Sequence, residues 1–268
     1  MSSLWRHLKA TPAMFRVSLA DTVAYRAELA IWVLTATLPL VMLALWETIA
    51  AGAPIAGMTK IEVSRYFAAA LIVRQLTGAW IVWEMNFEIR NGSLSAKLLK
   101  PLHPIWVWAV WTVSAMPFRM IVLTPLLALL AWARPELLTL PAAPDLALFA
   151  VSVTLALALA FLVQTAFGSL AFFMDRSIGM FSLWFGLWSF LSGYIAPTAF
   201  FPSWAQNILY YLPFRATLSI PVEILSGRLH GGLAWQEIGI QCVWVCVFGI
   251  IARTLWNTGV ARYEAFGS

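Results

Sequence analysis

A polar, basic segment able to make specific contacts is FEIRNGSLSAKLLKPLHP, Phe87–Pro104, which lies between two long apolar runs. Its Asn-Gly pair at 91–92 is typical of a turn. Ser93 is a plausible cap for a short helix over Leu94–Lys100, which the following proline would end. Such a helix would present Leu94 and Leu98 on one side and its lysines elsewhere. This chemistry suits docking to a partner protein, and the alternative is an ordinary basic loop at a membrane surface.

Two further cations, Arg74 and Arg119, fall deep inside apolar runs of the sequence. A charge at the middle of a bilayer costs about 2.5–3.5 kcal/mol on insertion scales, so its presence there is a functional hypothesis. The pair could line a polar route for an anionic headgroup. They could also pair across a helix with Glu84 or Glu47, or extend toward the membrane surface. Arg119 follows a Met-Pro-Phe run at which a kink is expected.

No group of residues in the sequence suits catalysis by this chain, and no enzyme activity is expected of it. None of the lysines ends a phosphate-binding loop, the histidines are too far apart for a zinc motif, and no nucleophile turn occurs. Cys242 and Cys246 are expected to be two small buried residues rather than a metal site. The basic residues lack the interleaved aromatics of a nucleic-acid surface, so no nucleic-acid partner is predicted.

The composition shows which elements must carry these residues. Hydrophobic residues make up 62% of the 268 residues and charged residues only 11%, and the mean hydropathy is +0.82. Soluble domains are about 45–50% apolar and about 25% charged, so the bilayer is the expected solvent. An all-α membrane protein of a single transmembrane domain over 1–268 follows, since uniformly apolar runs of this length do not suit a barrel.

Apolar runs long enough to span a bilayer, about 20 residues, predict six transmembrane helices. They are Leu29–Ala51, Val63–Met85, Ile105–Trp132, Leu146–Met174, Ile178–Ala199 and Trp235–Trp256.

The charges between these runs predict that both termini are cytoplasmic, because basic residues concentrate on that side. The predicted inner segments are much richer in arginine and lysine than the outer ones. The inner set is Arg6, Lys9, Arg16, Arg26, Arg90, Lys97, Lys100, Arg176, Arg253 and Arg262, and the outer set is Lys60, Arg134, Arg215 and Arg228. Segment 86–104 is thereby predicted to be a cytoplasmic loop.

Two flanking segments complete the predicted fold. Segment 1–28 mixes apolar and basic residues and indicates an amphipathic helix in the inner membrane interface. Segment 200–234 is too apolar for an ordinary loop, and its three prolines divide it into pieces too short to span. Short helices forming a re-entrant hairpin on the extracytoplasmic side fit it best, because irregular backbone at membrane depth must be sheltered by protein.

These features together resemble the permease subunits of ABC exporters of the ABC-2 type, in particular an uncharacterised bacterial branch. The resemblance is carried by four stretches, which cover most of the chain in the expected order. They are AYRAELAIWVLTATLPLVMLALW, FEIRNGSLSAKLLKPLHPIW, PTAFFPSWAQNILYYLPFRATLSIPVEILSG and the ending RTLWNTGVARYEAFGS.

The resemblance implies a dimer of identical or homologous permeases in the bacterial inner membrane, seated on a dimer of separate ABC ATPase subunits. ATP and Mg²⁺ would bind to those subunits, and this chain would bind no cofactor. The 86–104 loop would be the coupling loop, the 1–28 segment an interfacial elbow, and the hairpin a cap over the pathway. Glu88 and Arg90 would make charged contacts with the ATPase, and Leu94 and Leu98 apolar ones. The coupling residues are thus Glu88, Arg90, Gly92, Leu94, Lys97 and Leu98.

A carrier or lipid scramblase that works without ATP is the alternative. It would need coupling-ion carboxylates at mid-membrane, whereas Glu47, Glu84 and Glu237 all lie near the ends of predicted spans. A membrane scaffold without transport is a third possibility. Co-purification with an ATPase distinguishes the first class from the other two.

Overall fold

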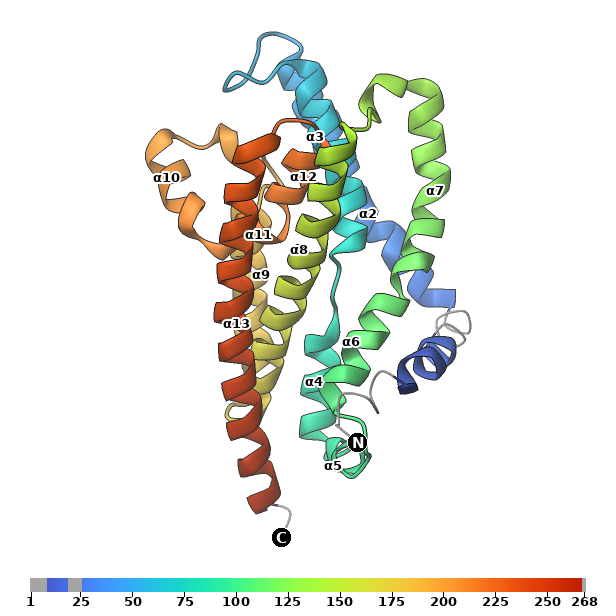
Figure 1. Ribbon diagram of the computed structural model, residues 1–268, viewed down its shortest axis with the longest axis vertical. Helices are drawn as coiled ribbons and strands as arrows, with labels where there is room; N and C mark the ends of the chain where they lie inside the picture. The colour runs from blue at the N-terminus through green and yellow to red at the C-terminus, as the bar shows by residue number, and fades with distance from the viewer. Residues whose placement is uncertain (1–8, 19–25, 267–268) are drawn as a thin grey trace.

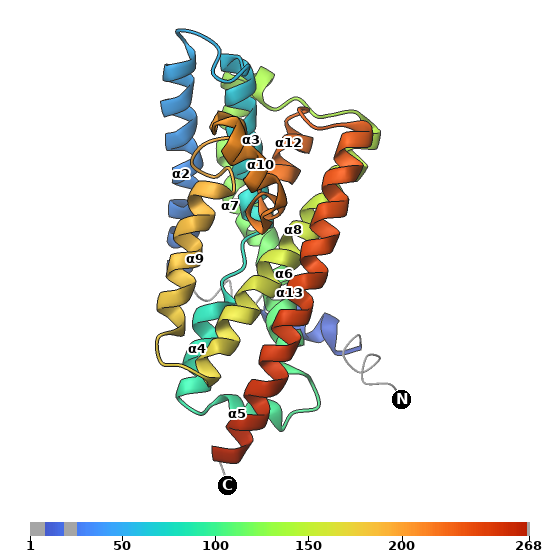
Figure 2. The same cartoon turned by 90° about the vertical axis from the view of Figure 1, so that its left-hand side faces the viewer.

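A computed structural model describes residues 9–18 and 26–266, and in these residues the chain is built from helices without a sheet (Figures 1 and 2). Four helical segments are long and apolar enough to cross a membrane. Two shorter apolar helical segments accompany them: Leu38–Ala50, which is the second half of a longer helix, and Ser177–Leu191. The four long segments are Lys60–Arg90, Pro104–Ala133, Ala143–Phe172 and Gly231–Tyr263. The predicted all-α, multi-pass class is therefore confirmed at this level.

The second predicted span is not one helix, which corrects the expectation of a continuous run over Val63–Met85. It consists of α3 (Lys60–Leu76) and α4 (Ile81–Arg90), separated by the non-helical residues 77–80. Figures 1 and 2 show this break as an irregular stretch near mid-height between the two ribbons. Helix α2 (Arg26–Ala50) packs along α3, which begins at a capping box between Thr59 and Glu62.

The third span bends where the sequence predicts a kink. Helix α6 (Pro104–Ser114) ends at Ala115, and α7 (Met116–Ala133) begins there with Pro117 in its first turn. A proline is tolerated in a first turn because that turn lacks intrahelical acceptors for its N–H groups. The bend leaves Arg119 on the first turn of α7, facing the break in span two.

Two long helices, α8 (Ala143–Ser169) and α13 (Gly231–Phe266), pack side by side along much of their length (Figure 1). Buried amides bind the bundle across helices. Gln241 of α13 donates to the backbone carbonyls of Ser152 and Ala216. Such polar contacts hold apolar helices together where lipid supplies no hydrophobic driving force.

The fifth span is shorter than predicted. Helix α9 (Ser177–Leu191) ends well before Ala199, and Gly193 follows with a φ of +89°, a backbone conformation that suits glycine. The chain then forms α10 (Ser203–Tyr211), α11 (Pro213–Thr217) and α12 (Ser219–Leu225). Pro202 and Pro213 stand at helix starts, as predicted, whereas Pro221 lies in the first turn of α12 and does not divide the segment there. Helices α11 and α12 are largely buried within the bundle.

Within the predicted elbow segment, residues 9–18 form a helix and residues 1–8 and 19–25 lie outside the described part. The helix, dark blue in Figure 1, lies beside α6 at the right-hand side of the lower half of the molecule. It packs on α6, where the Trp106 indole donates to the Thr11 hydroxyl and the hydroxyls of Ser18 and Ser114 form a hydrogen bond. Four short elements complete the order: α5 (Leu94–Leu98), η1 (Pro135–Leu137), η2 (Leu170–Phe172) and η3 (Thr198–Phe200).

Candidate functional site: a docking helix, a broken span and a polar network

The short helix α5 is anchored to the bundle by one fully buried side chain. Leu94 is 0% exposed and belongs to an apolar cluster with Trp108 of α6 and Trp256 of α13. The indole rings of these two tryptophans lie 5.7 Å apart, edge to face. Leu94 therefore faces the chain's own interior, and Leu98, the other predicted apolar contact, is half-buried beside the same cluster.

A buried ion pair forms the second attachment of α5. The Lys97 ammonium bonds the Glu88 carboxylate of α4, whose side chain is only 5% exposed. The ammonium also lies 5.5 Å from the centre of the Trp108 ring. Glu88 is thus occupied inside the chain and does not present its carboxylate to a partner. The hydroxyl of Ser93, at the N-cap position, donates to the Asn91 side chain instead of capping α5.

The turn into α5 and the end of α4 are fixed by Gly92 and Arg90. Gly92 has a φ of +81°, which glycine adopts at little cost. The Arg90 guanidinium donates to the Asp175 carboxylate at 2.9 Å and to the Met174 carbonyl. Arg90 therefore joins α4 to the turn between α8 and α9 rather than standing free.

The side of α5 that remains open to a partner differs from the predicted one. Leu99 is 89% exposed, the largest exposed fraction among the large hydrophobic residues described. Ser95, Ala96 and Lys100 are exposed beside it. An exposed leucine at the tip of a well-anchored helix is a suitable contact for another protein.

At the break in span two, side chains from distant helices satisfy backbone groups that would otherwise be bare. The Gln164 amide of α8 donates to the Ala79 carbonyl, and its oxygen accepts from the Val82 N–H. Arg119 of α7 donates to the Gly78 carbonyl. Because unpaired backbone groups are costly in lipid, these bonds allow a non-helical stretch inside the bundle.

Arg74, on the last turn of α3, is 8% exposed and lies among aromatic rings. Its guanidinium carbon is 5.3 Å from the ring centres of both Trp80 and Trp188 and 5.7 Å from that of Tyr194. The predicted pairing of Arg74 with Glu84 or Glu47 is not found among the described side chains. Glu47 instead pairs with Lys60 and Arg134.

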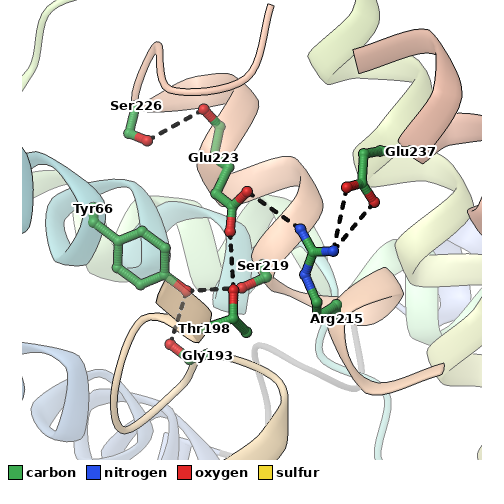
Figure 3. A network of polar contacts seen from close by, with 8 residues as sticks. All are labelled: Tyr66, Gly193, Thr198, Arg215, Ser219, Glu223, Ser226 and Glu237. Carbon is green, nitrogen blue, oxygen red and sulfur yellow. Dashed lines mark hydrogen bonds and ion pairs between the residues drawn. The ribbon is translucent and has the colours of Figure 1, made fainter. Parts of the chain in front are cut away.

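A polar network connects the short helices to the spans around them (Figure 3). Arg215 of α11 lies between two carboxylates, Glu223 of α12 at 3.4 Å and Glu237 of α13 at 3.2 Å. Beside it, the Tyr66 hydroxyl of α3 donates to the Gly193 carbonyl. Burial acts to lower the pKa of Arg215, but the two carboxylates more than offset this and raise it, so Arg215 stays charged.

The basic residues predicted to lie on opposite sides of the membrane are found at opposite ends of the bundle, and this holds whichever end faces the cytoplasm. Lys60 and Arg134 meet at Glu47, and Arg65 donates to the Glu136 carbonyl at the same end. At the opposite end Arg90 joins Asp175, and Arg262 lies over the Phe173 ring. Cys242 and Cys246, expected to be buried, are exposed.

Sequence reasoning missed the break itself, the aromatic cage of Arg74 and the Arg215 network. Two signals could have indicated the break: a Thr-Gly pair in the middle of span two, and Gln164 in the middle of span four. Glu223 and Glu237 likewise stand out in apolar surroundings. The rings around Arg74 come from segments far apart in the sequence, and no local pattern connects them.

The comparison with protein families agrees with this architecture. No curated protein matches the chain. The family described as ABC-2 family transporter protein matches residues 31–267, nearly the whole length and all the long apolar helices. The chain therefore belongs to the ABC-2 family of transporter membrane proteins.

Proposed function

We propose that this chain is the permease of an ATP-driven exporter, in which six transmembrane helices form the pathway. Helix α5 contacts a separate ATPase dimer and transmits its conformational change. The observation that carries the proposal is the exposed face of α5, with Leu99 89% exposed on a helix that Leu94 and Lys97 hold against the bundle. Family membership supports an ATPase partner in general. ATP and Mg²⁺ would act on that partner.

The contacts of α5 explain how a push on it would reach the spans. Leu94 contacts the cluster of Trp108 and Trp256, on α6 and α13, and the Glu88–Lys97 pair ties α5 to α4. Arg90 extends the connection to the turn before α9. Movement of α5 would thus shift several helices together as a rigid body, the kind of change that alternates access between two sides. ATP drives it if ATP binding favours one of the two states.

In this proposal Glu88, Arg90, Gly92, Leu94, Lys97 and Leu98 remain coupling residues, but most of them act by positioning α5. The partner-facing contacts pass to Leu99, Ala96, Ser95 and Lys100. A second permease, identical or homologous, completes the pathway. The exposed face of α9 supports such a contact, since a Cβ added at Gly186 would meet nothing within 4 Å and Leu183, Leu187 and Phe190 are exposed on the same helix.

The test is the Leu99→Asp variant in the purified complex with its ATPase. A charge at this contact should abolish about 90% of transport and of the permease-dependent ATPase stimulation, since a buried interface charge without a partner costs several kcal/mol. The matched control is Leu140→Asp, because Leu140 is a leucine with 76% exposure at the opposite end. Wild-type coupling in Leu99→Asp would overturn the assignment of α5, and transport by the chain without any ATPase would favour a carrier or scramblase.

A further inference from the structure

Arg74 has a buried charge that nothing in the described part of the chain neutralises. Its Nε is buried without a hydrogen-bond partner, and none of the ion pairs formed by the described side chains includes Arg74. The aromatic rings around it attract a cation through their faces but leave the N–H groups at its edge without acceptors. A buried guanidinium in this state is missing an acceptor.

A second guanidinium reaches the same place. A Cβ placed on Gly78 would lie 2.7 Å from Nη1 of Arg119 and 3.4 Å from Nη1 of Arg74. The two groups therefore converge on one residue of the break, and Arg119 is 5% exposed. Two positive charges this close repel each other strongly where water is excluded. An anion beside both would be attracted to each of them and would offset that repulsion.

The broken helix adds a third attraction for an anion. Helix α4 begins at Ile81 directly after the break, and its N-cap residue, Trp80, makes no side-chain capping bond. The N-terminal end of a helix carries partial positive charge and offers N–H groups to oxyanions. Trp80 and Ala79 line the cavity into which Arg74 projects, so the helix end and the guanidinium serve the same space.

The size of the cavity limits what can bind. It measures about 50 Å³ and is lined by Arg74, Thr77, Trp80, Gln164, Trp188 and Thr217 among others. About 10–15 Å³ suffices for one water molecule, so the space holds a group of a few heavy atoms. A phosphate or carboxylate fits, while a complete amphiphile does not. The aromatic walls suit the apolar atoms next to such a group.

We propose that the break between α3 and α4 is an oxyanion site, at which Arg74 holds the phosphate or carboxylate of an anionic amphiphile and the nearby charge of Arg119 adds to the attraction. Guanidinium groups suit this task because their planar fork donates two parallel hydrogen bonds to such an anion. The inference rests on the proposed export function, since it makes the bound headgroup part of the cargo. The amphiphile's tail then lies outside the cavity, between the helices or in the bilayer.

The test uses the full-length chain, purified in an uncharged detergent and offered phosphatidylglycerol or diacylglycerol. Native mass spectrometry measures how much of each lipid is retained. Arg74→Gln should retain about tenfold less phosphatidylglycerol, the effect of one charged hydrogen-bonding contact, and an unchanged amount of diacylglycerol, which has no oxyanion. The matched control is Arg65→Gln, on the same helix, whose guanidinium bonds the Glu136 carbonyl at one end of the bundle. Equal retention of phosphatidylglycerol by all three proteins overturns the proposal.

Inorganic phosphate distinguishes the two sources of the anion. If millimolar phosphate raises the melting temperature of the wild type but not of Arg74→Gln, the site binds the oxyanion without a tail. If only phosphatidylglycerol does so, the amphiphile is required, as we expect. Either result supports an oxyanion site, and no stabilisation by either ligand overturns it.

A photoreactive headgroup keeps the proposal testable should Arg74→Gln fail to fold. On the wild-type protein, cross-links from such a phosphatidylglycerol should map to Trp80 or to Trp188, and cross-links only elsewhere would overturn the site. The coupling function is tested separately: Leu99→Asp should retain phosphatidylglycerol normally while losing ATPase stimulation. Loss of the oxyanion site alone leaves the ATP-driven export proposal standing, whereas failure of the export proposal would leave a binding site whose ligand is not cargo.

Discussion

At the scale of single residues, Arg215 holds the short helices to the end of α13. Its guanidinium is the cation between Glu223 and Glu237, and all three side chains are largely buried, at 11–16% exposure. Removing one member of a buried charge group costs about 3–5 kcal/mol, because the remaining charges are left without compensation. These three side chains therefore stabilise the packing of α11 and α12 against α13 strongly, although they form only two ion pairs.

Arg215→Met should lower the free energy of unfolding by about 3 kcal/mol, measured by thermal unfolding in detergent. Arg228→Met is the control. Arg228 lines a cavity together with Arg215, Glu223 and Glu237, but it joins none of the ion pairs among the described residues. Adding Glu237→Gln to Arg215→Met should recover part of the loss by removing one uncompensated carboxylate. A single variant as stable as the wild type would show that the carboxylates do not depend on Arg215.

At the scale of elements, the break in span two depends on residues remote from it in sequence. The apolar pattern is similar on both sides of residues 77–80, so hydropathy predicts one helix there. What permits the break is Gln164, whose amide bonds both the Ala79 carbonyl and the Val82 N–H. The same limit applies to the coupling loop: its turn and short helix follow from local residues, whereas the burial of Leu94 depends on tryptophans of α6 and α13.

Gln164→Leu should therefore destabilise the protein by about 2–6 kcal/mol, since it leaves two buried backbone groups unpaired at about 1–3 kcal/mol each. Thermal unfolding measures the loss. Thr154→Val serves as control on the same helix, because the Thr154 hydroxyl is exposed and bonds only the Ala150 carbonyl. Equal stability of Gln164→Leu and Thr154→Val would mean that the Ala79 carbonyl and the Val82 N–H find other hydrogen-bond partners.

At the scale of the whole molecule, composition determines most of what could be predicted. The apolar runs locate all the long helices, because a bilayer requires continuous apolar length. The prolines locate the starts of α10 and α11. The sequence could not indicate which side chains meet at Arg74 or at Arg215, because each group gathers residues from helices whose mutual packing no local pattern specifies.

The segregation of charge predicts how the whole molecule lies in its membrane. The α5 end carries Arg90, Lys97 and Lys100, so the positive-inside tendency places it in the cytoplasm and the α10 end outside. In a Cys242→Ser, Cys246→Ser background, an impermeant thiol reagent applied to right-side-out vesicles should label Asn207→Cys and leave Ser95→Cys unlabelled until the membrane is opened. Both positions are exposed, so accessibility within the protein does not bias the comparison. Labelling of Ser95→Cys from outside would place α5 away from the ATPase side and remove the physical basis for coupling through Leu99.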